Sequence, residues 1–125
     1  MRGVEPATTH SAVAYHGCRV DALPGILTQG LRIGTRQAYA KRKDVRSGQV
    51  IGQGIYTTPC VREAERYAPR AFVDGYILSV LLMCGVRPAA IKRTRDEETY
   101  DSGVYWVVND AADVCPAAIL VRQVL

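Results

Sequence analysis

Three short segments of the chain carry residues that could bind and act on a ligand together. His16 and Gly17 follow the apolar run "VAY", Tyr56 belongs to "GQGIYTT", and Tyr67 lies eleven residues beyond Tyr56. An imidazole can hydrogen-bond a hydroxyl group, a glycine lets a ligand approach the backbone closely, and tyrosine rings can stack on a flat ligand. Each residue alone is more often an ordinary structural group, so only the combination indicates a site.

Length and composition predict one globular domain. The 125 residues are enough for a single core, and 48% hydrophobic with 22% charged residues is an ordinary soluble composition. We therefore expect one domain over residues 1–125, either a whole protein or part of a longer one. The longest apolar run, residues 76–86, is too short to span a bilayer. The N-terminus has no apolar segment of signal-peptide type, so we expect an intracellular protein, cytoplasmic or nuclear, with no membrane partner.

The cysteines do not have the spacing of a metal site. They stand at positions 18, 60, 84 and 115, and zinc sites usually take two ligands from one turn. We therefore expect no metal. Cys84 and Cys115 lie in apolar strand-like runs, where reduced core thiols are expected.

The net charge of +4 is concentrated in residues 36–46, which carry five cations against one Asp. A solvated loop is the default expectation for such a run. The alternative is a flap that attracts anions such as the phosphates of a nucleotide. Tyr39 is the one aromatic residue among these cations, so a nucleic-acid partner is open but less favoured.

Apolar runs bounded by turn residues predict five strands. They are expected at residues 11–15, from residue 54, at 76–86, at 104–109 and at 117–125. Residues 88–103 are polar and are expected to be irregular. On this prediction His16 and Gly17 stand where the first strand ends, a position with free backbone hydrogen-bonding groups.

Two short helices are predicted between the strands. One covers residues 22–29, with Asp21 as its N-cap and Gly30 at its end. The other begins at Pro59, which suits the first helical position, and runs to about Tyr67. The elements lack the regular strand–helix–strand crossovers of a parallel sheet. We therefore expect an α+β domain with a mostly antiparallel sheet and two small helices.

Taken in order, these segments resemble the catalytic domain of the poly(ADP-ribose) polymerase family, the diphtheria-toxin-like ADP-ribosyltransferases. The family has a Tyr/Trp-His-Gly-Ser/Thr element, a "GILxxGLRI"-like helix and a Gly-Ile-Tyr element. Here they match "YHGCRVDALPGILTQGLRIG" and "IGQGIYTTPCVREAERYA", and "YWVVNDAADVCPAAIL" is similar to the segment that holds the family's catalytic glutamate. The resemblance covers about residues 11–125. It implies a split β-sheet around an NAD cleft, with NAD as the substrate and no prosthetic group.

The resemblance also implies a role for each candidate residue. Gly17 would offer its backbone N–H and C=O to the nicotinamide carboxamide, and His16 would hydrogen-bond a ribose hydroxyl of the adenosine half. Tyr56 and Tyr67 would hold the nicotinamide ring between them. Arg32 matches a family position near the adenosine side.

Two positions depart from the family pattern. Ala64 stands where the family usually has a serine that hydrogen-bonds the carboxamide, a loss of about 1 kcal/mol. Tyr105 stands where polymerases have glutamate, so the triad becomes His–Tyr–Tyr. A phenol with a pKa of about 10 supplies a hydrogen bond but no negative charge at neutral pH. Glu98 is the first candidate for a replacement carboxylate, although a hydrated acidic loop is the default expectation for residues 96–101.

These features favour a NAD-dependent mono-ADP-ribosyltransferase that acts on a protein acceptor, with His16, Tyr56 and Tyr105 as its catalytic residues. A nucleic-acid end is the alternative acceptor. The main alternative function is a pseudoenzyme that holds NAD or ADP-ribose without turning it over. An RNA 2′-phosphotransferase of the same fold ranks last, because it needs a second histidine where residues 54–56 are Gly-Ile-Tyr.

Overall fold

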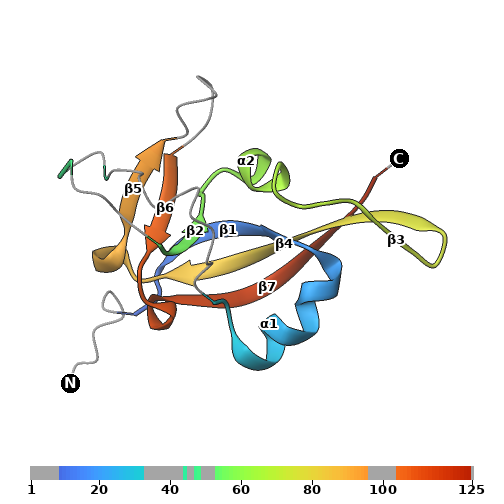
Figure 1. Cartoon of the computed structure of the whole chain (residues 1–125), viewed down its shortest axis with the longest axis horizontal. Coiled ribbons are helices and arrows are strands. Elements are labelled where there is room, and N and C mark those ends of the chain that lie inside the picture. Colours follow the sequence, from blue (N-terminus) through green and yellow to red (C-terminus); the bar gives the residue numbers. More distant parts are fainter. Residues whose placement is uncertain (1–8, 33–43, 45–46, 49–52, 96–103, 125) are drawn as a thin grey trace.

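The computed structural model describes residues 9–32, 44, 47–48, 53–95 and 104–124. Within these ranges the chain forms seven strands in two antiparallel sheets, together with two short α-helices (Figure 1). The expected α+β class with mostly antiparallel strands is therefore confirmed. Among these residues, no helix is long and apolar enough to cross a membrane.

The larger sheet is built around β4 (Tyr76–Val86), whose bounds agree with the expected strand. On one side β4 pairs with β1 (Ala12–Cys18) and β3 (Ala71–Val73), and on the other with β7 (Val114–Gln123). Because β4 is paired on both sides and covered by other elements, it needs a nearly continuous apolar sequence rather than an alternating one. Leu82, Cys84 and Val86 of β4 are fully buried.

The smaller sheet has β6 (Val104–Val108) in the middle, flanked by β2 (Ile55–Thr57) and β5 (Lys92–Arg95). It lies at the left end of the larger sheet in Figure 1, with β5 and β6 standing across β4. Within the described ranges, one isolated bridge joins the two sheets. The Tyr15 N–H donates to the Thr58 carbonyl at 2.7 Å, and the Thr58 N–H donates back at 3.0 Å. This bridge places β1 beside the end of β2.

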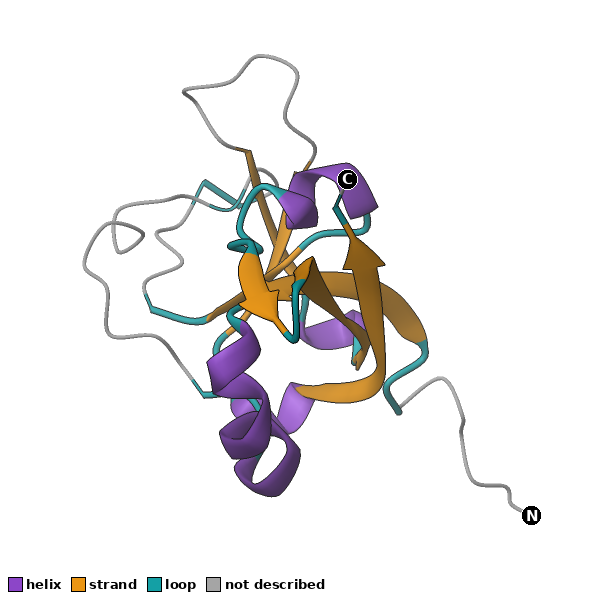
Figure 2. Cartoon of the chain, turned by 90° about the vertical axis from the view of Figure 1, so that its right-hand side faces the viewer, coloured by secondary structure: helices purple, strands orange, loops and turns teal. Residues whose placement is uncertain are grey.

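The two helices, α1 (Leu23–Gln29) and α2 (Val61–Glu65), lie on opposite sides of the strands (Figure 1 and Figure 2). Leu23 and Ile26 of α1 pack against the main core. On the other side, Ala64 of α2 and the following Ala68 pack against Leu81 of β4. Since small residues line this contact, the backbone of α2 can approach the sheet closely.

Both predicted helices exist, but their starts differ from the prediction. Asp21 is not the N-cap of α1, because its carboxylate pairs with Arg19 at 3.0 Å and a 3₁₀ turn precedes the helix. Gly30 ends α1 as expected, with a φ of 78° that favours glycine. The second helix begins at Val61 and is shorter than expected at both ends.

Other differences from the prediction concern strands and one thiol. β3 was not expected, and β5 lies in the segment predicted to be irregular. β1 continues through Gly17 to Cys18, so the predicted strand end is wrong. Cys84 is buried as expected, but Cys115 is exposed because it points outward between neighbours on β7. The expected single domain over 1–125 stays a prediction.

Candidate functional site

A cavity lies where β1, β2, α2 and β6 meet, next to the bridge between the sheets. Its walls contain five of the six residues that the sequence predicted for the site, namely His16, Gly17, Tyr56, Tyr67 and Tyr105. Ala64, the residue at the position where the family usually has serine, lies in the same wall. The fold therefore brings together residues that are up to 89 positions apart in the chain.

His16 is held in one orientation by a backbone contact. Its Nδ1 lies 2.9 Å from the carbonyl oxygen of Tyr56, and because that oxygen can only accept, Nδ1 carries the hydrogen. Burial lowers the pKa of His16, while the bond to Tyr56 opposes this shift. The imidazole is therefore neutral at pH 7, and its Nε2 is an acceptor suited to a hydroxyl group.

Gly17 exposes its backbone to the cavity for a different reason from the one expected. In an antiparallel ladder the N–H and C=O groups of alternate residues point to the same side. Those of Tyr15 point away from β4 and bond Thr58, so those of Gly17, two residues later, point the same way. The open side of the strand, rather than a strand end, makes these groups available.

The glycine itself is required by the approach of α2. A Cβ at position 17 would lie 2.3 Å from the carbonyl oxygen of Ala64, 2.9 Å from the carbonyl carbon of Tyr67 and 3.0 Å from the nitrogen of Ala68. All three atoms belong to the backbone and cannot rotate aside. Gly17 therefore lets the end of α2 rest directly on β1, which places Ala64 and Tyr67 at the cavity.

The two tyrosines from the predicted ring site come from different elements. Tyr56 lies in β2 opposite Val107 of β6, and Tyr67 follows α2 with 42% of its surface exposed. The ring of Tyr67 meets that of Tyr105 edge to face, with centroids 6.1 Å apart and planes at 75°. That Tyr56 and Tyr67 hold a flat ligand between them stays a prediction.

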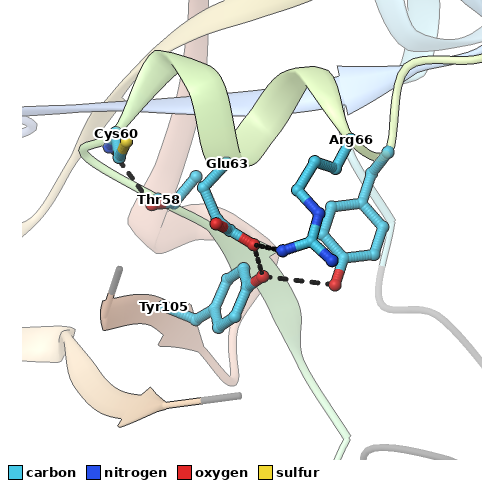
Figure 3. Close-up of polar contacts among 6 residues, drawn as sticks. Thr58, Cys60, Glu63, Arg66 and Tyr105 are labelled. Carbon is cyan, nitrogen blue, oxygen red and sulfur yellow. Dashed lines mark hydrogen bonds and ion pairs between the residues drawn. The ribbon is translucent and has the colours of Figure 1, made fainter. Parts of the chain in front are cut away.

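Tyr105 is almost completely buried, with 4% of its surface exposed. Its hydroxyl donates to Oε1 of Glu63 at 2.5 Å and lies 3.2 Å from the hydroxyl of Tyr67 (Figure 3). Since the one hydrogen of Tyr105 goes to Glu63, Tyr67 is the donor in the contact between the two hydroxyls. Burial, followed by the contacts with Glu63 and Tyr67, raises the pKa of Tyr105. The phenol is therefore neutral at physiological pH.

Glu63 was not predicted from the sequence. It lies in α2 with 6% of its surface exposed, and its Oε1 also accepts from Nη1 of Arg66 at 2.9 Å. The sequence contains no usable signal for its position, because a spacing of four places two residues on one face only within a helix, and Tyr67 lies beyond the end of α2.

Three of the predicted features are not part of the described cavity. Arg32 is exposed just after α1 and is absent from the cavity walls as far as these are described. Glu98, with the acidic segment 96–101, lies outside the described residues, as does the basic segment 36–46 apart from Asp44. The roles proposed for them stay predictions. In the described ranges, no group of three or more metal-ligating side chains is close enough to hold an ion.

A split antiparallel sheet with a histidine and tyrosines around one cavity is the architecture expected of an ADP-ribosyltransferase. The chain matches the family model of the poly(ADP-ribose) polymerase catalytic domain over residues 5–103. Because this match covers most of the chain, the protein belongs to that family, which confirms the resemblance. The family uses NAD as substrate and needs no prosthetic group. None of the curated proteins matches the chain.

The match ends before β6, the strand that carries Tyr105. The assignment of Tyr105 to the third catalytic position therefore depends on the similarity of "YWVVNDAADVCPAAIL" to the family segment and on the place of Tyr105 in the cavity wall. Both point to the same residue, since Tyr105 is the residue of β6 that lines the cavity as far as it is described.

Proposed function

We propose that this protein is a NAD-dependent mono-ADP-ribosyltransferase that modifies a protein acceptor. The observation that supports it most is the neutral phenol of Tyr105 in the same cavity as His16 and Tyr56. The family uses NAD as its substrate. The residue at the third catalytic position, Tyr105, distinguishes a single transfer from chain growth.

The residues of the cavity have to make three kinds of contact with NAD for the reaction. The bond between nicotinamide and ribose breaks through a state with positive charge at the anomeric carbon, as in glycoside hydrolysis. Gly17 offers a backbone N–H and C=O for the carboxamide, and neutral His16 offers Nε2 as an acceptor for a ribose hydroxyl. Tyr105 offers its hydroxyl oxygen to the ribose at the reacting end.

Chain growth also needs a base that takes the proton from the hydroxyl group of a second sugar. Such a base must be able to take up a proton near neutral pH. Tyr105 has a raised pKa and is already protonated, so it cannot act in this way. The described part of the cavity thus supports one transfer per site and gives no route to a polymer.

The second candidate is a binding module that holds NAD without turnover, and Ala64 favours it. This side chain is 2% exposed in the cavity wall, where the family's serine would hydrogen-bond the carboxamide. Loss of that hydrogen bond costs about 1 kcal/mol of the free energy that holds the leaving nicotinamide in position. A deficit of this size slows a reaction without abolishing it, so the enzyme is the better supported candidate.

The test is nicotinamide release from NAD by the native protein and by the Tyr105→Phe variant. Removal of one group that stabilises a transition state costs about 10²–10³ in rate, and Phe keeps the buried ring. We expect slow release from the native protein, a large loss in the variant, and equal binding of benzamide by both. If neither protein releases nicotinamide although NAD binds, the binding module is correct.

A further inference from the structure

Glu63 is a buried carboxylate that does not line the cavity, as far as the cavity wall is described. Burial of such a group is costly unless hydrogen bonds compensate it. Its Oε1 accepts two of them, from the Tyr105 hydroxyl at 2.5 Å and from Arg66 at 2.9 Å. Figure 3 shows the carboxylate of Glu63 between Tyr105 and Arg66, below α2. The contact with Tyr105 connects Glu63 to the reaction site.

The contact fixes which way the Tyr105 hydroxyl acts. A phenol has one hydrogen and can otherwise serve as donor or acceptor. Because Glu63 takes that hydrogen, any donor on the cavity side meets Tyr105 as an acceptor, and Tyr67 already does so at 3.2 Å. A carboxylate at this position would also act only as an acceptor. Because of Glu63, the Tyr105 hydroxyl therefore acts as a hydrogen-bond acceptor in the cavity, as the family's glutamate would.

The contact also brings a negative charge within one hydrogen bond of the site. Hydrogen bonds to a charged acceptor are short and strong, and in a buried chain each bond polarises the next. The Tyr105 oxygen becomes more negative when its hydrogen is shared with a carboxylate. Arg66 offsets part of this charge, but its side chain is half exposed and its effect is weakened by water.

We propose that Glu63 is a positioning residue for ADP-ribosyl transfer, acting through Tyr105 to hold and polarise the nicotinamide ribose. This inference rests on the proposed function. In the step concerned, the bond between C1′ and the pyridinium nitrogen breaks and its electron pair leaves with neutral nicotinamide. The acceptor's lone pair then forms the new bond to C1′, and the acceptor's proton passes to water. Glu63 stays a carboxylate and Tyr105 keeps its proton throughout, while the two residues stabilise the positive ribose.

The first test is Glu63→Gln, which keeps an acceptor oxygen and the shape of the side chain but removes the charge. Loss of a residue that hydrogen-bonds and orients a metal ligand typically costs about 10–100-fold, and we expect the same range for a residue that orients Tyr105. We expect kcat for nicotinamide release to fall by that factor, with KM for NAD and benzamide binding unchanged. The matched control is Glu65→Gln, which removes a charge from the same helix. Glu65 pairs with Arg122 at 2.9 Å, away from the cavity, and its variant should behave as the native protein.

A double-mutant cycle separates action through Tyr105 from a structural role. In a Tyr105→Phe background, Glu63→Gln should cause no further loss, because the connecting hydroxyl is already gone. The charge can also be moved. A Tyr105→Glu, Glu63→Gln double variant places the carboxylate at the third position directly, and it should recover at least the rate of the native protein.

The outcomes distinguish this inference from the proposed function. If the native protein is active and Glu63→Gln is equally active, Glu63 has no part in the reaction and only this inference fails. It also fails if Glu63→Gln costs as much with Phe at position 105, or if moving the charge gives no recovery. If the native protein releases no nicotinamide although NAD binds, both fail together. Should Glu63→Gln alone not fold, the double variant, which keeps one buried carboxylate, decides by its rate relative to the native protein.

Discussion

Gly17 should be the least replaceable small residue of the cavity, and Gly17→Ala tests this. The added Cβ would lie 2.3 Å from the Ala64 carbonyl oxygen, more than an ångström inside an ordinary contact of about 3.5 Å. The next two atoms, at 2.9 and 3.0 Å, are also backbone. The clash can therefore be relieved only by moving the end of α2 away from β1.

Overpacking of this kind usually costs about 1–3 kcal/mol, and backbone neighbours place Gly17→Ala towards the upper end of that range. The displaced segment carries Ala64 and Tyr67. The folded variant should therefore bind benzamide more weakly than the folded native protein, in addition to being less stable. The matched control is Gly25→Ala. Gly25 is in α1 with nothing within 4 Å of an added Cβ, and alanine there should stabilise the helix by about 0.5–1 kcal/mol.

Urea unfolding of the native protein and of both variants measures these free energies directly. The expected result is a loss of stability for Gly17→Ala and a gain for Gly25→Ala. A Gly17→Ala variant that is as stable as the native protein and binds benzamide equally well would show that α2 does not rest on β1 as described.

Three further predictions concern ligands and pH. Benzamide or NAD at about 100 Kd should raise the free energy of unfolding by roughly 2.7 kcal/mol. His16→Ala should weaken the effect of NAD far more than that of benzamide. A melting curve unmoved by either ligand would contradict this prediction. Because burial lowers the pKa of His16 below 6.5, the unfolded chain takes up this proton first, so native stability should fall as pH drops below 6.5. His16→Gln should remove that part of the loss, and identical pH profiles would refute it. Ala64→Ser should restore a donor for the carboxamide and tighten benzamide by about 1 kcal/mol, and an unchanged Kd in calorimetry would place Ala64 away from the carboxamide.

Elements with a strong local signal could be predicted from the sequence. β4 is a nearly continuous apolar run of eleven residues, which is the pattern of a strand covered on both faces. Gly30 ends α1 because its positive φ is costly for other residues. The candidate site residues were predicted because their types and spacing resemble the family's segments, and the structure places five of the six around one cavity.

The missed strands have weaker signals. β3 is three residues long and is held by the turn at Asp74 and Gly75, which have φ values of 50° and 84°. An Asp-Gly pair between apolar residues is a hairpin signal that was available in the sequence. β5 is the charged stretch "KRTR", whose pairing with β6 leaves no apolar pattern to detect.

Two features of the site depend on tertiary packing and could not be derived locally. Gly17 suggested a strand end, but it is a mid-strand residue whose missing Cβ makes room for the backbone of α2. Glu63 has the sequence context of a solvated helix charge, yet it is buried because Tyr105, 42 positions later, supplies a hydrogen-bond donor. Charged residues are expected at the surface unless a partner is known.

The central claim, that this cavity supports one ADP-ribose transfer per site through a neutral tyrosine, is tested most directly by mass spectrometry of the products formed from NAD by the native protein. Modified sites should each carry a single ADP-ribose unit at all reaction times, and the signal should fall with Tyr105→Phe. Ladders of two or more units on one site would contradict the claim, because chain growth needs an anionic base that Tyr105 cannot provide.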